Sequence, residues 1–280
     1  MRDLPIGFLD SGFGGLTVVR QSLKQLPNES IIYIGDSARA PYGPRPLSEV
    51  KKYIKQLTQF LMNKGIKMLV IACNTGTAAA LNELKDEISI PVVGVIHAGS
   101  RSAIKMTNNQ KIGVICTQGT VESHLYQSVI LNKEKNVEVY EHAVPEFVKI
   151  VEEQRIQEPE TMATIKQDLL PLKERNIDTL VLGCTHYPLM RQEIQSVMGP
   201  EVTLIDSGAE TISEVSALLD YFNLSRTSSD NDLNPATQTY FTTGDGTDFA
   251  KFTQKLFNQP DLQVHEVEIV GDELVDNSNA

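Results

Sequence analysis

The sequence predicts an α/β fold with mostly parallel sheets, divided into two similar halves. Short apolar runs alternate with longer amphipathic stretches, which is typical of parallel strands joined by crossover helices. The strand-like runs also recur at a nearly constant offset, which indicates an internal duplication. A length of 280 residues is enough for two ordinary domains, each with a packed core.

The elements follow from the spacing of apolar residues. Strands of the first half are expected at residues 6–9, 31–34, 68–72 and 92–96, and strands of the second half at 112–115, 137–140, 180–182 and 202–205. Helices between these strands are expected at residues 16–26, 50–63 and 162–172, from their composition or from the helical spacing of their apolar residues. A last pair of strands, 239–242 and 264–269, brackets a helix at 248–257.

Matching strands support the duplication. Equivalent strand residues of the two halves are separated by a similar number of positions in the chain. The separation is 106 for Ile6 and Ile112, 106 for Ile31 and Val137, 111 for Leu69 and Leu180, and 110 for Val92 and Val202. Two such halves would form one cleft at the carboxyl edges of their sheets, where ligands bind in open parallel sheets. We expect a first domain at residues 1–97 plus about 208–270, a second at 98–207, and a flexible acidic tail at 271–280.

Composition excludes several classes of protein. Lys and Arg total 25 against 36 acidic residues, and the net charge of −11 disfavours a nucleic-acid partner. No apolar run approaches the roughly 18 residues of a membrane helix, and the expected strand at Ile6 leaves no room for a signal peptide. Three scattered cysteines make neither a disulfide scaffold nor a zinc knuckle. We therefore expect a reduced, cytoplasmic protein with no partner at the membrane.

Two of the cysteines occupy matching positions. Cys73 and Cys184 each end a strand-like run and precede small hydroxyl or amide residues at the start of an expected helix. We expect both thiols to face the cleft, with helix N–H groups lowering their pKa from about 8.5. A single cysteine is more often an inert core residue, and this is our interpretation of Cys116, whose match in the first half is Asp10.

A symmetric pair of thiols allows three kinds of chemistry. A disulfide switch is one, and a metal site is another, although His186 alone adds too few ligands nearby. The third is proton transfer at opposite faces of one carbon, where a thiolate and a thiol exchange roles with the direction of reaction. A duplicated half-site supplies that third pair directly.

Other candidates lie at the same expected edge. Asp10 and Ser11 begin a Gly-rich turn whose backbone N–H groups could bind the carboxylate of a ligand. The GFGG sequence of this turn matches neither a Walker loop nor the GxGxxG motif of dinucleotide-binding proteins. The loop 41–44 is a plain turn or a substrate contact. Helix capping is an equal alternative for the second DSG tripeptide, residues 206–208, and a strong one for the threonines at 117 and 120.

Five segments together resemble the aspartate/glutamate racemase family, over nearly the whole chain. They are IGFLDSGFGG (6–15), YIGDSARAPYGPRP (33–46), IACNTGTA (71–78), GVICTQGTV (113–121) and LGCTHYPL (182–189). Within that family, the DSGxGG start and the Tyr-Gly loop resemble the glutamate racemases. The resemblance implies two α/β domains in pseudo-twofold relation, with the active site in the cleft between them.

The resemblance also implies a reaction and its residues. The expected function is racemisation of L-glutamate to D-glutamate for peptidoglycan, with Cys73 and Cys184 on opposite faces of the α-carbon. Asp10 would assist Cys73, and His186 would assist Cys184. Glu152 matches another assisting carboxylate, although its segment has Val144-Pro145 where the family has Cys-Pro. The family's substrate-binding positions fall on Asp10, Ser11, Tyr42, Gly43, Asn74, Thr75, Thr117, Thr120, Thr185 and His186.

No cofactor and no metal are expected. The chain has no lysine in a recognisable pyridoxal phosphate setting and no dinucleotide fingerprint, so N–H groups and hydroxyls must stabilise the carbanionic substrate. The family expectation for assembly is a homodimer. Some members have an N-terminal extension for activation by a cell-wall precursor; Asp10 lies nine residues after Met1, so we expect that control to be absent.

Two other functions remain open at this level. One is a racemase for aspartate, or a decarboxylase or cis-trans isomerase of the same superfamily; a decarboxylase would be favoured by loss of one cysteine, and both are present. The other is a two-lobed binding protein or redox sensor that closes over a small acid without chemistry.

Overall fold

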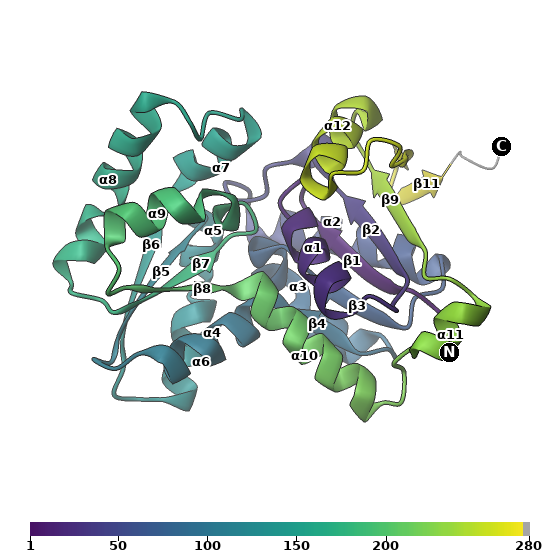
Figure 1. Cartoon of the computed structure of the whole chain (residues 1–280), viewed down its shortest axis with the longest axis horizontal. Helices are drawn as coiled ribbons and strands as arrows, with labels where there is room; N and C mark the ends of the chain where they lie inside the picture. The colour runs from purple at the N-terminus through teal and green to yellow at the C-terminus, as the bar shows by residue number, and fades with distance from the viewer. Residues whose placement is uncertain (277–280) are drawn as a thin grey trace.

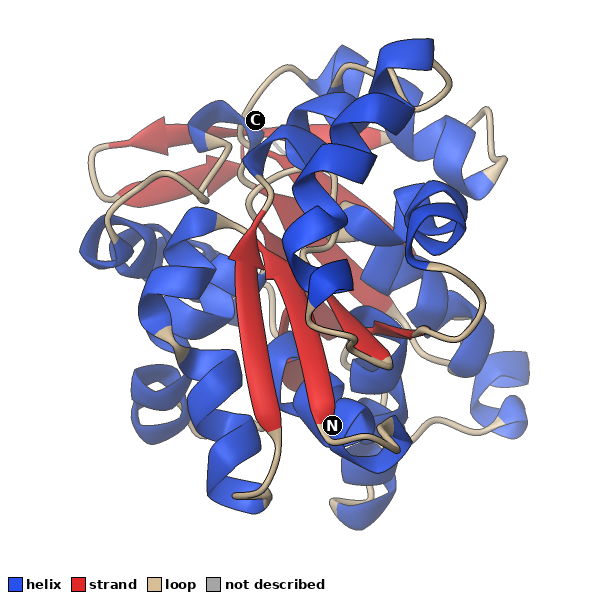
Figure 2. Ribbon diagram, turned by 90° about the vertical axis from the view of Figure 1, so that its left-hand side faces the viewer, coloured by secondary structure: helices blue, strands red, loops and turns tan. Residues whose placement is uncertain are grey.

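A computed structural model describes residues 1–276 of the chain, which contain two sheets with helices on both faces (Figures 1 and 2). The seven-stranded sheet has the order β11-β10-β9-β2-β1-β3-β4, and the four-stranded sheet has the order β6-β5-β7-β8. Every strand pair is parallel except β10 with β11. The predicted α/β class with mostly parallel sheets is confirmed.

The first half of the molecule is the seven-stranded sheet with its helices. It begins with β1 (Ile6–Asp10), α1 (Leu16–Gln25), β2 (Ile31–Gly35), the short η1 (Ser37–Arg39), α2 (Leu47–Asn63), β3 (Met68–Ile71), α3 (Asn74–Glu87) and β4 (Val92–Gly94). The chain returns to it through α10 (Ser207–Tyr221), α11 (Ser228–Leu233), β9 (Gln238–Thr242), α12 (Gly246–Phe257), β10 (Val264–Val270) and β11 (Glu273–Asp276).

The second half is the four-stranded sheet with its helices. Its elements are α4 (Val95–Met106), β5 (Lys111–Cys116), α5 (Gln118–Ser123), α6 (Leu125–Lys133), β6 (Glu138–Ala143), α7 (Pro145–Glu152), α8 (Pro159–Glu174), β7 (Thr179–Gly183), η2 (Tyr187–Met190), α9 (Arg191–Met198) and β8 (Thr203–Asp206). The N-terminal end of α7 follows the usual preference for Pro in the first helical turn.

The strand order shows the duplication directly. The order β2-β1-β3-β4 recurs as β6-β5-β7-β8. Ile6 pairs with Met68 and Ile112 pairs with Thr179, so the central strands keep the offsets of 106 and 111. The outer strands are displaced by two residues from the sequence match, because Ile112 pairs with Val139 rather than Val137. A shift of two residues keeps the same side chains on the same face of the sheet.

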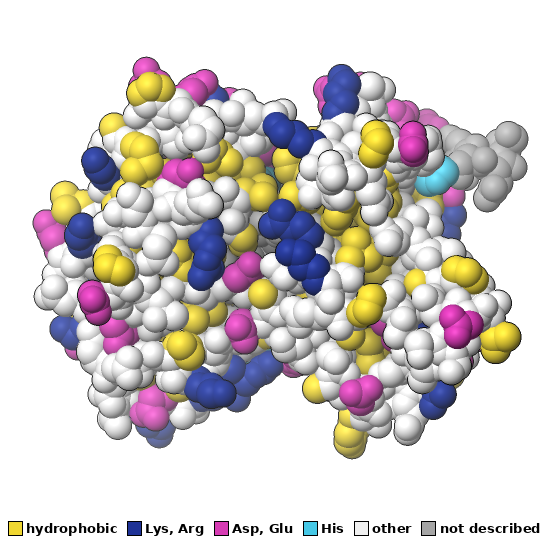
Figure 3. Space-filling view, in the orientation of Figure 1, with side chains coloured by type: hydrophobic (Ala, Val, Ile, Leu, Met, Phe, Trp, Pro, Cys, Tyr) yellow, Lys and Arg dark blue, Asp and Glu magenta, His cyan; other side chains and the backbone are white. Residues whose placement is uncertain are grey.

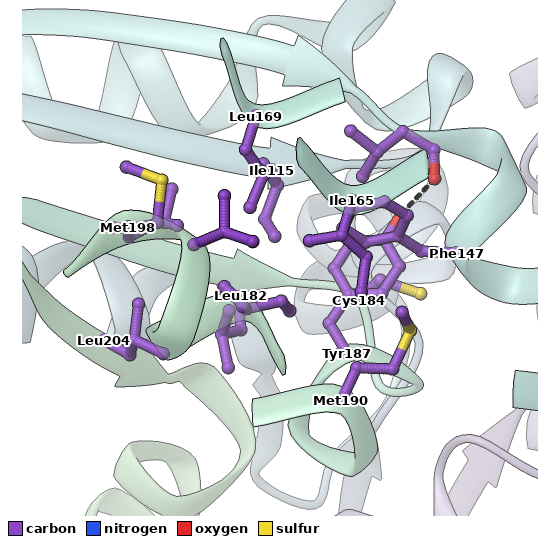
Figure 4. Packing of buried hydrophobic residues seen from close by; sticks show 14 of the residues in the cluster. Ile115, Phe147, Ile165, Leu169, Leu182, Cys184, Tyr187, Met190, Met198 and Leu204 are labelled. Carbon is purple, nitrogen blue, oxygen red and sulfur yellow. Dashed lines mark hydrogen bonds between the residues drawn. The ribbon is translucent and has the colours of Figure 1, made fainter. Parts of the chain in front are cut away.

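Four apolar clusters cover the faces of the two sheets. In the first half, Leu9 and Ile71 face the cluster that includes α2 and α3, whereas Phe8 and Val70 face the cluster that includes α1 and α10. This alternation is what a strand buried on both faces requires. In the second half, one cluster lies under α7, α8 and α9, and Cys184 belongs to it together with Tyr187 and Met190 (Figure 4).

The helices α4 and α10 pack against each other where the two halves meet (Figure 1). Gly99 of α4 allows the close approach, since a Cβ there would lie 2.3 Å from the Oγ of Ser207. The domain limits that we expect from the sequence, at 97/98 and 207/208, fall in α4 and at the start of α10. We propose that the boundary between the two domains falls within this helix pair.

The C-terminal segment corrects one expectation. Residues 273–276, expected in a flexible tail, form β11, which pairs antiparallel with β10. Leu274 packs on the core beside α2, and Lys64 forms an ion pair with Asp276. The remaining tail residues, 277–280, lie outside the described part of the chain. No helix within residues 1–276 is long and apolar enough to cross a membrane.

Candidate active site

The two matching cysteines line one cavity. Cys73 is the N-cap of α3, where its Sγ accepts a hydrogen bond from the N–H of Gly76 at 3.3 Å, and Cys184 directly follows β7. Both side chains are buried, and the cavity that they line has about 320 Å³ of empty volume. Its lining comes from both halves: Ser11, Pro41, Tyr42, Gly43, Cys73, Asn74, Thr75, Thr117, Val148, Cys184, Thr185 and His186.

The structure therefore brings the predicted site residues together. Asp10, Thr120 and Glu152 are the predicted residues that do not line the cavity. Each lies one contact behind it: Asp10 behind Thr185, Thr120 behind Thr75, and Glu152 behind His186. Cys116 is fully buried in another apolar cluster and does not line the cavity.

Asp10 is a fully buried carboxylate at the end of β1. Its Oδ2 accepts hydrogen bonds from the N–H groups of Gly12 at 3.0 Å and Gly15 at 2.9 Å, so the Gly-rich turn wraps its own strand-end carboxylate. Burial raises the pKa of Asp10, while His186 and the backbone N–H groups oppose that rise. The Oγ1 of Thr185, from the second half, lies 3.5 Å from Oδ1.

The electrostatics of Cys73 correct the expectation of a lowered thiol pKa. Burial raises the pKa of Cys73 well above its ordinary value, and the nearby charges of Asp10 and Cys184 raise it further. The hydrogen bonds from Gly76 and Ser11 act in the predicted direction but are outweighed. Desolvation dominates because the Cys73 side chain is almost wholly buried. Burial therefore disfavours the thiolate form of Cys73.

On the other side, Cys184, His186 and Glu152 form a chain of contacts. The Sγ of Cys184 lies 3.6 Å from Nδ1 of His186, and Nε2 of His186 lies 3.2 Å from Oε1 of Glu152. Burial acts to lower the pKa of His186, but the hydrogen bonds with Cys184 and Glu152 outweigh it and raise that pKa to about 10. Both contacts therefore favour the protonated form of the His186 ring. Glu152 therefore lies against His186, although its segment has Val144-Pro145 where the family has Cys-Pro.

Three threonines join the halves beside Cys73. The Oγ1 of Thr117 lies 2.9 Å from Oγ1 of Thr75 and 3.0 Å from Oγ1 of Thr120. Thr117 also caps α5, so capping and cavity lining occur in the same side chain. The N–H of Gly119 donates to the carbonyl of Gly43 at 2.9 Å, which ties the 41–44 loop to α5. Only glycine fits at position 43 without a shift of its neighbours, because a Cβ there would lie 2.9 Å from the Cβ of Thr117.

Tyr42 lines the cavity, and its hydroxyl is fixed by a hydrogen bond. Its hydroxyl donates to Oδ2 of Asp36, a buried carboxylate that also accepts from Nε of Arg39 at 2.7 Å. Burial and the charge of Asp36 raise the pKa of Tyr42 well above its ordinary value, so the phenol stays neutral. Tyr42 therefore contributes shape and an apolar wall rather than a proton-transfer group.

The Gly-rich turn packs directly on the second half. A Cβ at Gly14 would lie 2.2 Å from Oγ1 of Thr185 and 2.7 Å from Nδ1 of His186. Behind it, Oγ1 of Thr17 donates to the carbonyl of Thr185 at 2.9 Å. The start of α1 thus fixes the 184–186 segment across the cleft, a role for Thr17 that the sequence reasoning missed.

Tyr33 and Tyr126 were missed as well. The hydroxyl of Tyr33 donates to the carbonyl of Gly12 at 2.6 Å, and the hydroxyl of Tyr126 donates to Oδ1 of Asn74 at 2.8 Å. Both rings are fully buried. In the sequence, an aromatic residue within an apolar run or on the apolar face of a helix is indistinguishable from a core residue, so no signal could have found them.

A second, larger groove lies between the halves on the face shown in Figure 3, with Lys and Arg side chains on both of its sides. It has about 1380 Å³ of empty volume, and Arg20, Arg191 and Lys255 are among its lining residues. Neither cysteine lines it. Within residues 1–276, no three His, Cys, Asp or Glu side chains are placed so that they could hold a metal ion. The thiol-lined cavity is therefore the candidate active site.

The known proteins that this chain is similar to are racemases. Residues 14–215 match the family model described as Asp/Glu/Hydantoin racemase. A glutamate racemase from Carnobacterium sp. is 50% identical over 267 residues, which cover 95% of this chain and 99% of that protein. A crystal structure of a glutamate racemase isoform from Bacillus anthracis superposes with a TM-score of 0.90 at 39% identity, covering 98% and 100% of the two chains. The glutamate racemase of Francisella tularensis in complex with D-glutamate superposes with a TM-score of 0.85 at 32% identity, covering 97% and 99%.

Proposed function

The chain belongs to the aspartate/glutamate racemase family and is an amino-acid racemase, and from this premise we propose that it interconverts L- and D-glutamate by proton transfer through Cys73 and Cys184. The observation that carries the proposal is the equivalent placement of the two thiols, one from each half, in the lining of a single cavity. An acid and a base on opposite faces of the α-carbon are what inversion at that carbon requires.

The balance of the reaction is simple. The thiolate of one cysteine removes the α-proton and becomes a thiol, while the thiol of the other cysteine delivers a proton to the opposite face and becomes a thiolate. The reverse reaction exchanges their roles. Both sulfurs must lie within reach of one carbon, and the small cavity between the halves provides that constraint.

In this proposal, the ammonium group of the substrate adds positive charge beside Cys73. The pKa of Cys73 is raised by burial and by neighbouring negative charge, so an ammonium group entering the cavity favours the thiolate. Asp10, a buried carboxylate with a raised pKa, is the base that we propose for the proton of Cys73. On the other side, the His186 imidazolium, oriented by Glu152, stabilises the thiolate of Cys184 and returns its proton.

The α-carboxylate needs donors, because negative charge develops next to it when the α-proton leaves. Ser11, Asn74, Thr75, Thr117 and Thr185 line the cavity with hydroxyl and amide groups. We propose that these residues hold the substrate, with Gly43 and the ring of Tyr42 closing the cavity. Glutamate is the proposed substrate because the similar proteins are named glutamate racemases and one structure contains D-glutamate.

The cellular setting is also part of the proposal. We place the enzyme in the cytoplasm, where reduced thiols persist, as a homodimer that needs neither metal nor organic cofactor. Its D-glutamate would serve peptidoglycan synthesis. These statements rest on the family resemblance and on the chemistry of the two thiols.

Circular dichroism tests the proposed reaction. Protein dialysed against EDTA is added to L-glutamate without pyridoxal phosphate, and we expect the ellipticity to decay to zero; D-glutamate should decay from the opposite sign. L-aspartate is the matched control and should decay far more slowly. Turnover that requires added metal or cofactor, or a faster reaction with aspartate, would contradict the proposal.

A further inference from the structure

Tyr126 connects the two halves at the cavity. Its ring belongs to the apolar core of the second half, and a Cβ at Gly183 would lie 3.1 Å from it, so the ring lies against the residue that precedes Cys184. Its hydroxyl leaves that core and donates to Oδ1 of Asn74, the first residue of α3 in the first half. The same hydroxyl lies 2.9 Å from Oγ of Ser207, the first residue of α10.

The direction of these hydrogen bonds follows from the donor inventory. An amide oxygen can only accept, and a phenol has one proton, so the proton of Tyr126 is directed to Asn74 and Ser207 donates to the phenol oxygen. Burial raises the pKa of Tyr126 well above its ordinary value, with Ser207 opposing that rise, so the phenol keeps its proton. The chain from Ser207 to Tyr126 to Asn74 therefore has a single direction.

We propose that Tyr126 is a positioning residue that fixes the side-chain amide of Asn74 with its oxygen turned away and its Nδ2 amino group available to the substrate carboxylate. This inference rests on the function proposed above. An amide that is free to rotate presents its oxygen as readily as its amino group, and an oxygen facing a carboxylate would be repulsive. Tyr126 removes that alternative, because Asn74 lines the cavity while its oxygen is already bound.

Tyr126→Phe is the primary test, because it removes the hydroxyl and keeps the ring. We expect kcat/KM for glutamate to fall about tenfold with most of the change in KM, as for the loss of one oriented hydrogen bond. Tyr240→Phe is the matched control: Tyr240 is also buried and donates to a side-chain oxygen, that of Gln238 at 3.0 Å, but it lies away from the cavity. The control should keep the wild-type KM.

A double-mutant cycle separates positioning from general destabilisation. In an Asn74→Ala background there is no amide to orient, so Tyr126→Phe should cause little further loss of kcat/KM. Independent, multiplying losses would overturn the proposal. Should Tyr126→Phe fail to fold, Ser207→Ala provides the second variant, with an expected rise in KM of about two- to threefold. An unchanged KM in Ser207→Ala would count against the proposed chain of hydrogen bonds from Ser207 through Tyr126 to Asn74.

A spectroscopic measurement reads the orientation without turnover. The ¹⁵N side-chain amide pair of Asn74 is identified by its loss in Asn74→Ala. We expect that pair to shift or broaden in Tyr126→Phe and to stay in place in Tyr240→Phe. If the wild-type protein failed to racemise glutamate, the proposed function would fall, while this measurement would still decide on Tyr126. An Asn74 signal that is identical in wild type and Tyr126→Phe would refute the positioning role.

Discussion

Cys73 and Cys184 are the same residue of two copies of one structural unit. The step between them is 111 residues, equal to the step between Met68 and Thr179, the residues of β3 and β7 that pair with equivalent positions of β1 and β5. Duplication of a sheet with a thiol at one strand end therefore gives two thiols, and the packing of the halves places both in one cavity.

Replacing either of these cysteines should abolish most turnover. We expect Cys73→Ala and Cys184→Ala each to lower kcat/KM by about 10²–10⁴-fold, the usual cost of a lost general acid or base. Enantiomers have equal free energy in water, so each variant must lose kcat/KM equally in both directions. Cys116→Ala is the control and should stay within a few-fold of wild type. A fully active Cys184→Ala enzyme in the circular dichroism assay would exclude the two-thiol mechanism.

The raised pKa of His186 predicts a particular pH dependence. The hydrogen bonds with Cys184 and Glu152 favour the protonated ring of His186. Their contribution to the stability of the folded protein is therefore complete below the ordinary His pKa of about 6.5, and it is lost as the pH rises through about 10. Glu152→Gln removes a charged acceptor, so the His186 pKa falls. The alkaline limb of the kcat/KM profile should then move to lower pH.

Glu153→Gln is the matched control for that shift. Glu153 is the next residue, is exposed, and pairs with Arg155 at 2.5 Å instead of with His186. Its profile should overlay that of wild type. Identical alkaline limbs in wild type and Glu152→Gln would mean that Glu152 does not set the protonation of His186.

The Gly-rich turn predicts a steric effect on catalysis. In Gly14→Ala, the new methyl group would overlap Thr185 and His186, and His186 is already held between Cys184 and Glu152. We expect kcat/KM to fall about a hundredfold, as for a misplaced catalytic group. Gly12→Ala should cost much less, because its Cβ meets only that of Ala40 at 3.7 Å. Equal losses in the two variants would argue against the contact across the cleft.

A buried ion pair predicts a stability effect without a catalytic one. Lys67, fully buried at the amino end of β3, pairs with Glu29 and also donates to the carbonyls of Arg2 and Leu224. Lys67→Met leaves Glu29 without its cation, and the free energy of unfolding in urea should fall by about 3–5 kcal/mol. Lys52→Met, at an exposed pair with Asp272, should leave that free energy almost unchanged. A changed KM for Lys67→Met would contradict the separation of this pair from the site.

Sequence reasoning was most successful where the signal is local. The strands, the duplicated order and the two cysteines at strand ends all follow from short patterns that each segment carries by itself. The strand β11 was missed because its two apolar residues, Leu274 and Val275, are flanked by acidic and polar residues. This segment becomes a strand by pairing with β10. The offset of β6 was wrong by two residues, since a half-exposed edge strand has little apolar pattern to fix its register.

The electrostatic state of the site could not be predicted in the same way. The position of Cys73 at a helix start is a local feature, and it argues for a lowered thiol pKa. Its burial depends on residues from distant parts of both halves, and burial has the larger effect on the thiol pKa. Likewise, Asn74 is visible in the sequence as a neighbour of Cys73, but its partner Tyr126 lies 52 residues away and is found only in the folded chain.

Isotope incorporation in D₂O tests the central claim most directly. With two bases, one cysteine keeps the abstracted proton while the other delivers a solvent-derived deuteron to the opposite face. Early in the reaction, mass spectrometry after chiral separation should therefore find deuterium at the α-carbon of nearly all product glutamate, and almost none in the recovered substrate. Unlabelled product, or deuterium appearing equally fast in substrate and product, would contradict the two-thiol mechanism.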